Sequence, residues 1–207
     1  MFEDPVEDTR CVLHCEMKNE GFKTASKVQY VARVGNFIDN GADYTGALQI
    51  LKVILSYDYL WQNIRVKGGA YGCMSGFSRT GEGYFVSYRD PNLERTMEVY
   101  EGIADYLRNF TVSDRDMNKY IIGTMSNIDQ PMTPSAKGDR SFNLYMNKVS
   151  AETIKKERLQ ILEAGQEDIR KLADVVEAVM KAEQVCVIGS EEKIEEAKDM
   201  FKNVTTF

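Results

Sequence analysis

The chain has 207 residues, of which 43% are hydrophobic and 10% aromatic, and this composition fits a folded globular protein rather than a disordered one. Its 26 basic and 32 acidic residues give a net charge of −6, and because neither sign forms a long run, we expect no nucleic-acid partner. The sequence has no apolar stretch of about 18 residues, so we also expect no membrane span and no membrane partner.

The N-terminal residues Met1–Pro5 are acidic, whereas a secretory signal peptide begins with basic and then apolar residues. The cysteines are scattered along the chain, which favours free thiols in a reducing compartment over a disulfide framework. We therefore expect a protein of the bacterial cytoplasm or of an organelle matrix, not a secreted one.

Cys11 and Cys15 flank the single histidine, His14, and this is the one place where the sequence could gather metal ligands. Ligands so closely spaced normally need a second pair elsewhere in the chain, and no other histidine exists. A protease triad would also depend on His14, which lies in an alternating segment typical of a strand face. We predict that this chain holds no metal and no cofactor of its own.

The N-terminal part of the chain predicts strands. Residues 1–20, with loose alternation over Cys11–Met17, favour either an interdomain linker or a first strand. Glu20–Thr24 contains a glycine and is expected to turn the chain. Lys27–Gly35 then alternates well, which predicts a half-buried strand.

Apolar residues at helical spacing over Tyr44–Tyr59 predict a helix that continues through Leu60 and ends at the paired glycines Gly68 and Gly69. A strand is expected to follow. The glycines remove side chains at this break, and we expect them to let another backbone approach, as a peptide-binding surface requires.

Arg65 and Tyr71 lie on the two sides of this break, and no folding argument requires both residue types. In a purely structural interpretation, Arg65 lies on a solvated helix face and Tyr71 is a half-buried aromatic of an edge strand. In a functional interpretation, they are a fixed cation and a phenol that face a bound peptide.

Ala70–Phe77 and Tyr84–Tyr88 predict a hairpin around the glycine-containing turn Arg79–Gly83. Asp90 and Pro91 are expected to begin a helix, because aspartate accepts from the first amides and proline is preset for the first turn. The apolar stripe of that helix should cover the sheet, and it consists of Leu93, Met97, Tyr100, Ala104 and Leu107.

The C-terminal half predicts mainly helices. Three of them are expected to begin after the N-caps Ser113, Thr133 and Ser150. The strongest apolar stripe lies within Ile169–Met180 and precedes an apolar strand at Val185–Gly189. A last helix should begin after Ser190 and end near Phe201.

Strands and helices are partly segregated in this order of elements, which indicates an α+β fold. We expect a mainly antiparallel sheet packed against helices, with a helix-rich C-terminal half. The chain has no linker rich in proline, glycine or serine and no convincing repeat, so residues 1–207 are expected to form one domain.

The usual catalytic and phosphate-binding motifs are absent from the sequence. Zinc proteases place two histidines one helical turn apart, whereas this chain has a single histidine. The glycines around Gly68 do not have the spacing of a phosphate-binding loop. Acidic pairs such as Glu191 and Glu192 lie at expected helix starts, where the helix dipole explains them. From residue types alone, the Arg65 and Tyr71 pair is the main functional candidate.

Four segments carry a resemblance to a known family, namely Val28–Gly35, Leu60–Gly72, Tyr88–Asn92 and Val185–Gly189. Together they are similar to the last domain of pitrilysin-family zinc metallopeptidases, and most similar to the presequence-protease-like branch. The run Ile-Arg-Val-Lys-Gly-Gly-Ala-Tyr-Gly is the most specific part of the resemblance. The similarity extends from about Glu20 to the end of the chain.

The resemblance implies a polypeptide of four homologous α+β domains of the LuxS/MPP-like metallopeptidase type, which close around a chamber. This chain would be the fourth domain. In the family, zinc is bound by an H-x-x-E-H motif and a distal glutamate in the first domain, and this chain lacks that motif. The resemblance therefore implies a zinc metalloendopeptidase whose fourth domain alone is inactive.

The resemblance also implies roles for the candidate residues. Arg65 and Tyr71 match the positions from which the family's fourth domain contacts the substrate across the chamber and stabilises the transition state. Gly68 and Gly69 would let the substrate approach. The implied partners are peptide substrates and the N-terminal catalytic domains of the same polypeptide.

Two alternatives belong to other functional classes. The chain could be a non-catalytic structural or processing-partner homologue, although a scaffold would need neither Arg65 nor Tyr71. It could instead be a stand-alone module that binds an extended peptide along a strand edge. The alternatives are separated by whether the native reading frame continues upstream of Met1 into a segment with H-x-x-E-H.

Overall fold

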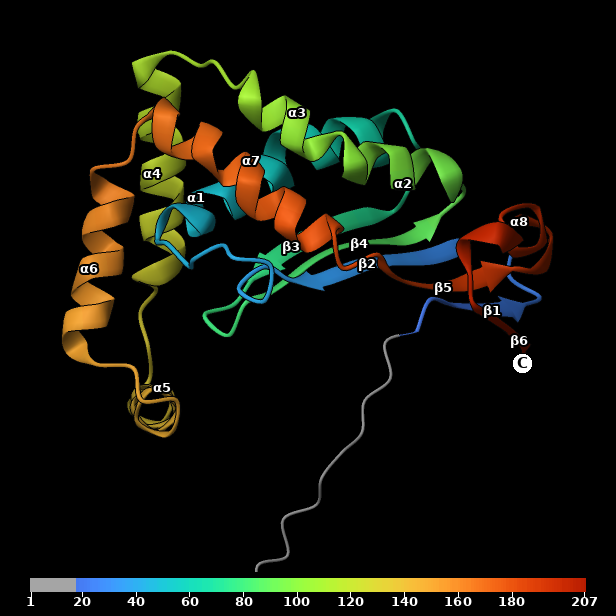
Figure 1. Ribbon diagram of the computed structural model, residues 1–207. Coiled ribbons are helices and arrows are strands. Elements are labelled where there is room, and N and C mark those ends of the chain that lie inside the picture. The colour runs from blue at the N-terminus through green and yellow to red at the C-terminus, as the bar shows by residue number, and fades with distance from the viewer. Residues whose placement is uncertain (1–17) are drawn as a thin grey trace, which may run out of the picture.

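The computed structural model describes residues 18–207, and within this range six strands form one mixed sheet in the order β3-β4-β2-β5-β1-β6 (Figure 1). The strands are β1 (Glu20–Thr24), β2 (Gln29–Asn36), β3 (Gly72–Phe77), β4 (Glu82–Asp90), β5 (Gln184–Ser190) and β6 (Asn203–Thr206). Residues 1–17, with Cys11, His14 and Cys15, lie outside the described residues.

The sheet is antiparallel from β3 to β5 and parallel beyond. The pairs β3–β4, β4–β2 and β2–β5 are antiparallel, whereas β5–β1 and β1–β6 are parallel. The β3–β4 pair is the predicted hairpin, and its register places Gly72 opposite Tyr88 and Phe77 opposite Gly83. The expected mainly antiparallel sheet is therefore present, with a parallel extension at the β6 edge.

The helices are α1 (Ala47–Ile54), α2 (Glu94–Glu101), α3 (Ile103–Arg108), α4 (Asp114–Ile128), α5 (Pro134–Met146), α6 (Ala151–Leu162), α7 (Gln166–Met180) and α8 (Glu191–Glu196). Helices α2, α3 and α7 lie over one face of the sheet, and α4 and α6 stand at its side (Figure 1). Ser113, Thr133 and Ser150 accept the predicted N-cap hydrogen bonds. Among residues 18–207, no helix combines the length and the apolar character that a membrane crossing needs.

The hydrophobic core lies between this face of the sheet and the helices. Leu51 of α1, Val176 of α7, Phe85 of β4 and Tyr100 of α2 are fully buried in one apolar cluster. Burying a side chain of this size contributes about 1.5–3 kcal/mol to folding. The α+β class with a helix-rich C-terminal half is thus confirmed.

The opposite face of the sheet is covered by none of the described helices (Figure 1). Large side chains on this face are partly exposed, among them Tyr30, Met74 and Ile188. In β2, Val31 is buried under the helices while its neighbour Tyr30 is exposed, so the strand is half-buried as predicted.

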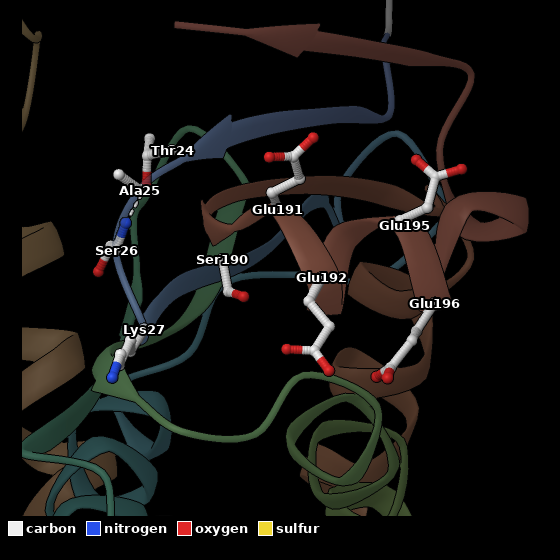
Figure 2. Close-up of a pocket in the computed structure, with 9 residues that line it drawn as sticks. All are labelled: Thr24, Ala25, Ser26, Lys27, Ser190, Glu191, Glu192, Glu195 and Glu196. Carbon is white, nitrogen blue, oxygen red and sulfur yellow. Dashed lines mark hydrogen bonds between the residues drawn. The ribbon is translucent and has the colours of Figure 1, made fainter.

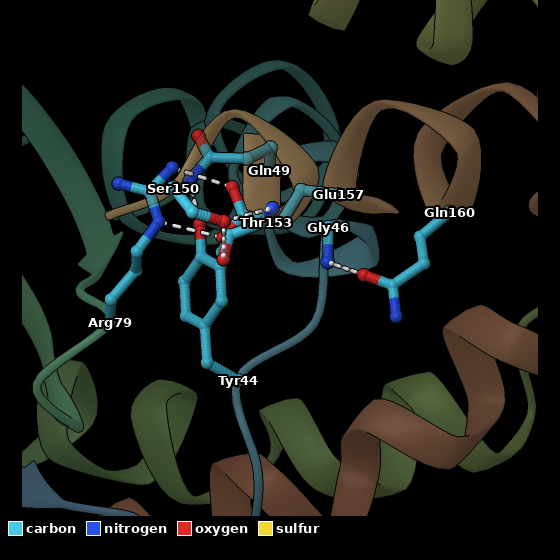
Figure 3. Close-up of polar contacts among 8 residues, drawn as sticks. All are labelled: Tyr44, Gly46, Gln49, Arg79, Ser150, Thr153, Glu157 and Gln160. Carbon is cyan, nitrogen blue, oxygen red and sulfur yellow. Dashed lines mark hydrogen bonds and ion pairs between the residues drawn. The ribbon is translucent and has the colours of Figure 1, made fainter. Parts of the chain in front are cut away.

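A polar network ties α6 to the rest of the molecule (Figure 3). Arg79, in the turn between β3 and β4, donates from Nε and Nη2 to the two carboxylate oxygens of Glu157, at 2.7 and 2.5 Å. Its guanidinium also lies 5.6 Å from the ring centre of Tyr44. Gln160 of α6 accepts the backbone N–H of Gly46 at 2.8 Å. These contacts fix α6 against the start of α1 and the hairpin turn.

The prediction of a turn at Glu20–Thr24 is wrong, because this segment forms β1. It pairs with β5 on one side and with β6 on the other. Gly21 accounts for the misleading signal, since a Cβ atom there would lie 3.0 Å from Ile194 and 3.2 Å from Phe201. The glycine is needed for close packing of the strand rather than for a turn.

The predicted helix start at Asp90 and Pro91 is also wrong. Asp90 ends β4, and its carboxylate accepts the backbone N–H of Asn92 at 2.9 Å and the hydroxyl of Thr96 at 2.7 Å. Helix α2 begins only at Glu94. The aspartate thus holds a turn before the helix instead of capping the helix directly.

The last predicted helix is shorter than expected. Helix α8 ends at Glu196, a 3₁₀ turn covers Lys198–Met200, and the unpredicted strand β6 follows. All residues of β6 are exposed, so its sequence lacks the alternation that marks a half-buried strand.

Candidate functional site

The candidate site lies where the first helix of the core meets the edge strand β3. Helix α1 continues into two π-helical segments, η1 (Leu55–Tyr59) and η2 (Trp61–Val66). π-Helical turns are rare in proteins, and those that occur are often found at functional sites. Segment η2 ends at Val66, just before Gly68 and Gly69. Strand β3 begins at Gly72, so Tyr71 lies one residue before the strand, although the prediction of Ala70–Phe77 included it.

Both glycines of the break have a local structural requirement. A Cβ atom on Gly68 would lie 2.4 Å from the carbonyl oxygen of Ile64, which belongs to the preceding turn. Gly69 has a φ of +80°, a conformation that glycine adopts without strain. Their expected role in letting a substrate approach stays a prediction, because the chain's own geometry already accounts for them.

Arg65 is exposed and is positioned by an aromatic ring one helical turn earlier. Its Cζ atom lies 4.2 Å from the ring centre of Trp61, within the range of a cation–π contact, and 5.9 Å from the ring centre of Tyr71. The residues separated by the break in the sequence are therefore neighbours in space. The indole restricts the guanidinium without neutralising its charge.

Tyr71 is held by its backbone and ring, while 59% of its surface is exposed. Its N–H donates to the carbonyl oxygen of Arg89 at 3.3 Å, and its ring centre lies 5.6 Å from that of Tyr88. It is thus more exposed than the half-buried strand aromatic of the structural interpretation. Within residues 18–207, its hydroxyl has no side-chain hydrogen-bond partner.

Three residues beside the pair were not predicted as site residues, namely Trp61, Tyr88 and Arg89. The Cζ atom of Arg89 lies 5.6 Å from the ring centre of Tyr71. Two arginines therefore lie near the phenol ring, Arg65 from the helix before the glycines and Arg89 from β4. The spacing of Trp61 and Arg65 by one helical turn was a visible signal. No comparable signal marks Arg89, because a strand sequence does not reveal its register.

Arg65 and Arg89 have no ion-pair partner among residues 18–207, a property they share with Arg33, Arg95, Arg115 and Arg140. By contrast, Arg79, Arg108 and Arg158 each contact a carboxylate. A guanidinium without a partner retains its full capacity to bind an acceptor on another molecule. We call Trp61, Arg65, Tyr71, Tyr88 and Arg89 the Arg–Tyr cluster.

Cys73 lies two residues beyond Tyr71 but is a poor nucleophile. Burial raises the pKa of its thiol to about 11, although the positive charge of Arg65 acts in the opposite direction. At neutral pH the thiol is therefore protonated, whereas a catalytic cysteine needs the thiolate. The Arg–Tyr cluster can donate hydrogen bonds and positive charge but offers no covalent chemistry.

A hollow of about 670 Å³ lies at the other end of the sheet, between β1, β5 and α8 (Figure 2). Its lining is acidic and includes Glu191, Glu192, Glu195 and Glu196. Within residues 18–207, no group of histidine, cysteine, aspartate or glutamate side chains is arranged to bind a metal ion. The described residues therefore do not fit a zinc site.

Residues 19–192 match the family described as "PreP C-terminal domain". Protein HypA of Clostridium perfringens is 48% identical over 187 residues, which cover 90% of this chain and 19% of that protein. Presequence protease 1, chloroplastic/mitochondrial, of Arabidopsis thaliana is 32% identical over 188 residues, covering 90% and 17%. The chain thus spans less than a fifth of the length of these curated relatives.

Solved structures show the same fold. Pitrilysin superposes with a TM-score of 0.60 at 14% identity, covering 95% of this chain and 22% of that chain. A peptidase M16 inactive domain from Pseudomonas fluorescens gives a TM-score of 0.57 at 16% identity, covering 86% and 45%. These structures support the α+β architecture and, at such low identity, nothing beyond it.

Proposed function

The chain belongs to the presequence-protease (PreP) C-terminal domain family, as its resemblance implied, and from this premise we propose that it is the substrate-binding domain of a longer zinc metalloendopeptidase. In that polypeptide it would contact peptides held in a closed chamber, opposite a zinc ion bound by an N-terminal domain. The observation that supports this proposal most is the exposed, unpaired and positionally fixed pair of Arg65 and Tyr71.

The two side chains would have different tasks. A guanidinium stays charged and can donate hydrogen bonds from two N–H groups at once, so Arg65 would bind a carbonyl oxygen of the peptide. The Tyr71 hydroxyl would donate a hydrogen bond to the oxygen that gains negative charge when water attacks the peptide bond. Such a bond strengthens as the charge develops, so Tyr71 would act on the transition state more than on substrate binding.

Zinc would enter only through the rest of the polypeptide, because the described residues assemble no ligand set for it. We expect the 207-residue chain to fold, to hold no stoichiometric zinc after dialysis, and to hydrolyse no peptide. Metal analysis of the dialysed chain checks this expectation. One tightly held zinc ion per chain would contradict it and would direct attention to Cys11, His14 and Cys15.

The proposal is tested with Tyr71→Phe in the complete polypeptide. Losing one oxyanion donor typically lowers turnover about a hundredfold, or roughly 3 kcal/mol, and the Michaelis constant should change much less. Tyr145→Phe is a matched control, because Tyr145 is 80% exposed on α5. Wild-type turnover of Tyr71→Phe on short peptides, with an unchanged melting temperature, would refute the proposed role.

A second candidate function is supported by the edge position of β3. Among residues 18–207 this strand pairs only with β4, so an extended peptide could add to its other edge. A stand-alone peptide-binding module of this kind would bind peptides without other domains. The reading frame upstream of Met1 separates the two functions, since the proposed peptidase requires an H-x-x-E-H segment there.

A further inference from the structure

Arg89 is exposed because of an irregularity in the pairing of β4 with β2. Val31 lies opposite Ser87, and Gln29 lies opposite Asp90. Two steps along β2 therefore match three steps along β4, so β4 contains one extra residue after Ser87. β-bulges of this kind re-aim a side chain and are over-represented beside active sites.

The bulge changes the face to which Arg89 belongs. Ser87 is buried under the helices, and simple alternation would place the second residue after it on the same covered face. Instead Asp90 takes the buried position, with no exposed surface, and Arg89 remains exposed. The irregularity thus keeps a guanidinium beside the Tyr71 ring and out of the core.

The backbone of Arg89 is strained, with a φ of +49° that residues with a Cβ atom seldom adopt. Strain of this kind persists where neighbouring groups hold it, and it is concentrated at functional sites. Here the holding groups are known. Asp90 accepts from Asn92 and Thr96, and Asn92 donates from Nδ2 to the carbonyl oxygen of Gly68 at 2.6 Å.

The same hydrogen bonds connect both parts of the Arg–Tyr cluster. Asn92 joins the turn after β4 to the Gly68 turn, and the carbonyl of Arg89 accepts the N–H of Tyr71. Arg65 and Arg89 are therefore fixed relative to one phenol ring, at 5.9 and 5.6 Å from its centre. Two positive charges are thus held beside one ring, in a chain of net charge −6.

We propose that Arg89 is a third substrate-binding residue, and that with Arg65 it binds a carboxylate group of the peptide substrate. The inference rests on the proposed function and specifies the substrate class: peptides that present a carboxylate near the cleaved bond, from an acidic side chain or from a free C-terminus. A guanidinium matches a carboxylate with two parallel N–H···O bonds, and a peptide offers no other anionic group unless it is modified.

The test uses variants of the complete polypeptide that spare the bulge. Arg89→Asn removes the guanidinium, and asparagine tolerates positive φ better than most residues. Arg89→Lys keeps the positive charge but loses the two parallel N–H donors of the guanidinium. Arg115→Gln is the matched control, since Arg115 is an exposed arginine on α4 that does not belong to the Arg–Tyr cluster. Melting temperatures report whether each variant keeps its fold.

Each variant is assayed on three peptides that differ only in one carboxylate group. The first has a glutamate near the cleaved bond and a free C-terminus, the second replaces the glutamate by glutamine, and the third has a C-terminal amide. Arg89→Asn should lower kcat/KM about tenfold or more on the first peptide, as loss of a charge-assisted hydrogen bond does. The neutral analogue that lacks the bound carboxylate should show no such loss, which identifies the source of the carboxylate.

Two results would overturn the inference. An equal loss on all three peptides would show that Arg89 only supports the backbone, and no loss on any peptide would show that it does not contact the substrate. Assays of Tyr71→Phe on the same peptides show whether only the inference about Arg89 fails or the proposed function fails as well. If Tyr71→Phe lowers turnover while Arg89→Asn shows no dependence on the carboxylate, only the inference fails.

Discussion

The two edges of the sheet differ in charge and in how their charged side chains are held. At the β3 edge, Arg65 and Arg89 are held by aromatic rings and have no ion-pair partner among residues 18–207. At the α8 end, Lys23 contacts Glu195, and Lys193 contacts Glu196 at 2.6 Å. The acidic end thus has a hollow whose neighbouring charges are partly paired, and the β3 edge has two arginines without an ion-pair partner.

This difference shows why a hollow alone does not identify a binding site. Glu191 and Glu192 lie in the first turn of α8, where negative charge stabilises the free amides. Glu195 and Glu196 end the helix and are paired with lysines, so none of these glutamates requires a ligand. Arg65 and Arg89 have no comparable structural partner. They lie against the rings of Trp61 and Tyr71, and no carboxylate among residues 18–207 pairs with them.

Among changes to the charged residues of the two edges, replacement of Arg65 should have the largest effect. In the complete polypeptide, Arg65→Lys keeps the charge but loses the fork and the flat contact with Trp61, so turnover should fall about ten- to a hundredfold. Steady-state kinetics measure the loss, and Arg115→Lys controls for arginine replacement in general. Wild-type turnover of Arg65→Lys would remove the proposed distinction between the two edges.

A second prediction concerns the packing that supports the cluster. A Cβ atom on Gly72 would lie 2.4 Å from the Tyr88 ring, so Gly72→Ala should lower the free energy of unfolding by about 1–3 kcal/mol. Gly138→Ala, in α5, meets nothing within 4 Å and should instead stabilise by about 1 kcal/mol. Denaturant unfolding of both variants gives the comparison, and equal effects would contradict it.

How much of this was predictable depends on whether a residue's partners are local. The N-caps Ser113, Thr133 and Ser150 were predicted correctly because each bonds an amide three residues later. Strands β1 and β6 were missed because their parallel pairing joins distant segments and leaves little alternation.

The same rule applies to the site: residues that stand out in the local sequence could be predicted, and a residue placed by distant strand pairing could not. Arg65 and Tyr71 could be singled out as residue types that the local fold does not require, and the structure places them side by side. Arg89 could not, because its exposure depends on a bulge between β2 and β4 that only the register reveals. The hydrogen bonds of Asp90 were likewise misinterpreted as those of a helix cap.

The smallest effect is expected at the acidic end. Replacing Glu191 and Glu192 together by glutamine removes two charges from the hollow and should leave turnover within about twofold of wild type. The melting temperature should fall slightly, because the first turn of α8 loses its favourable charges. A turnover loss as large as that of Arg65→Lys would show that the hollow, not the β3 edge, contacts the substrate.

The most direct test of the central claim compares two ligands of the complete polypeptide. One is an intact peptide, bound to enzyme whose zinc motif has been inactivated, and the other is a phosphinic analogue that imitates the tetrahedral transition state. Tyr71→Phe should weaken binding of the analogue about a hundredfold and change binding of the peptide little, because the hydroxyl meets its acceptor only as charge develops. Equal weakening of both ligands, or of neither, would contradict the assignment of Tyr71 to the transition state.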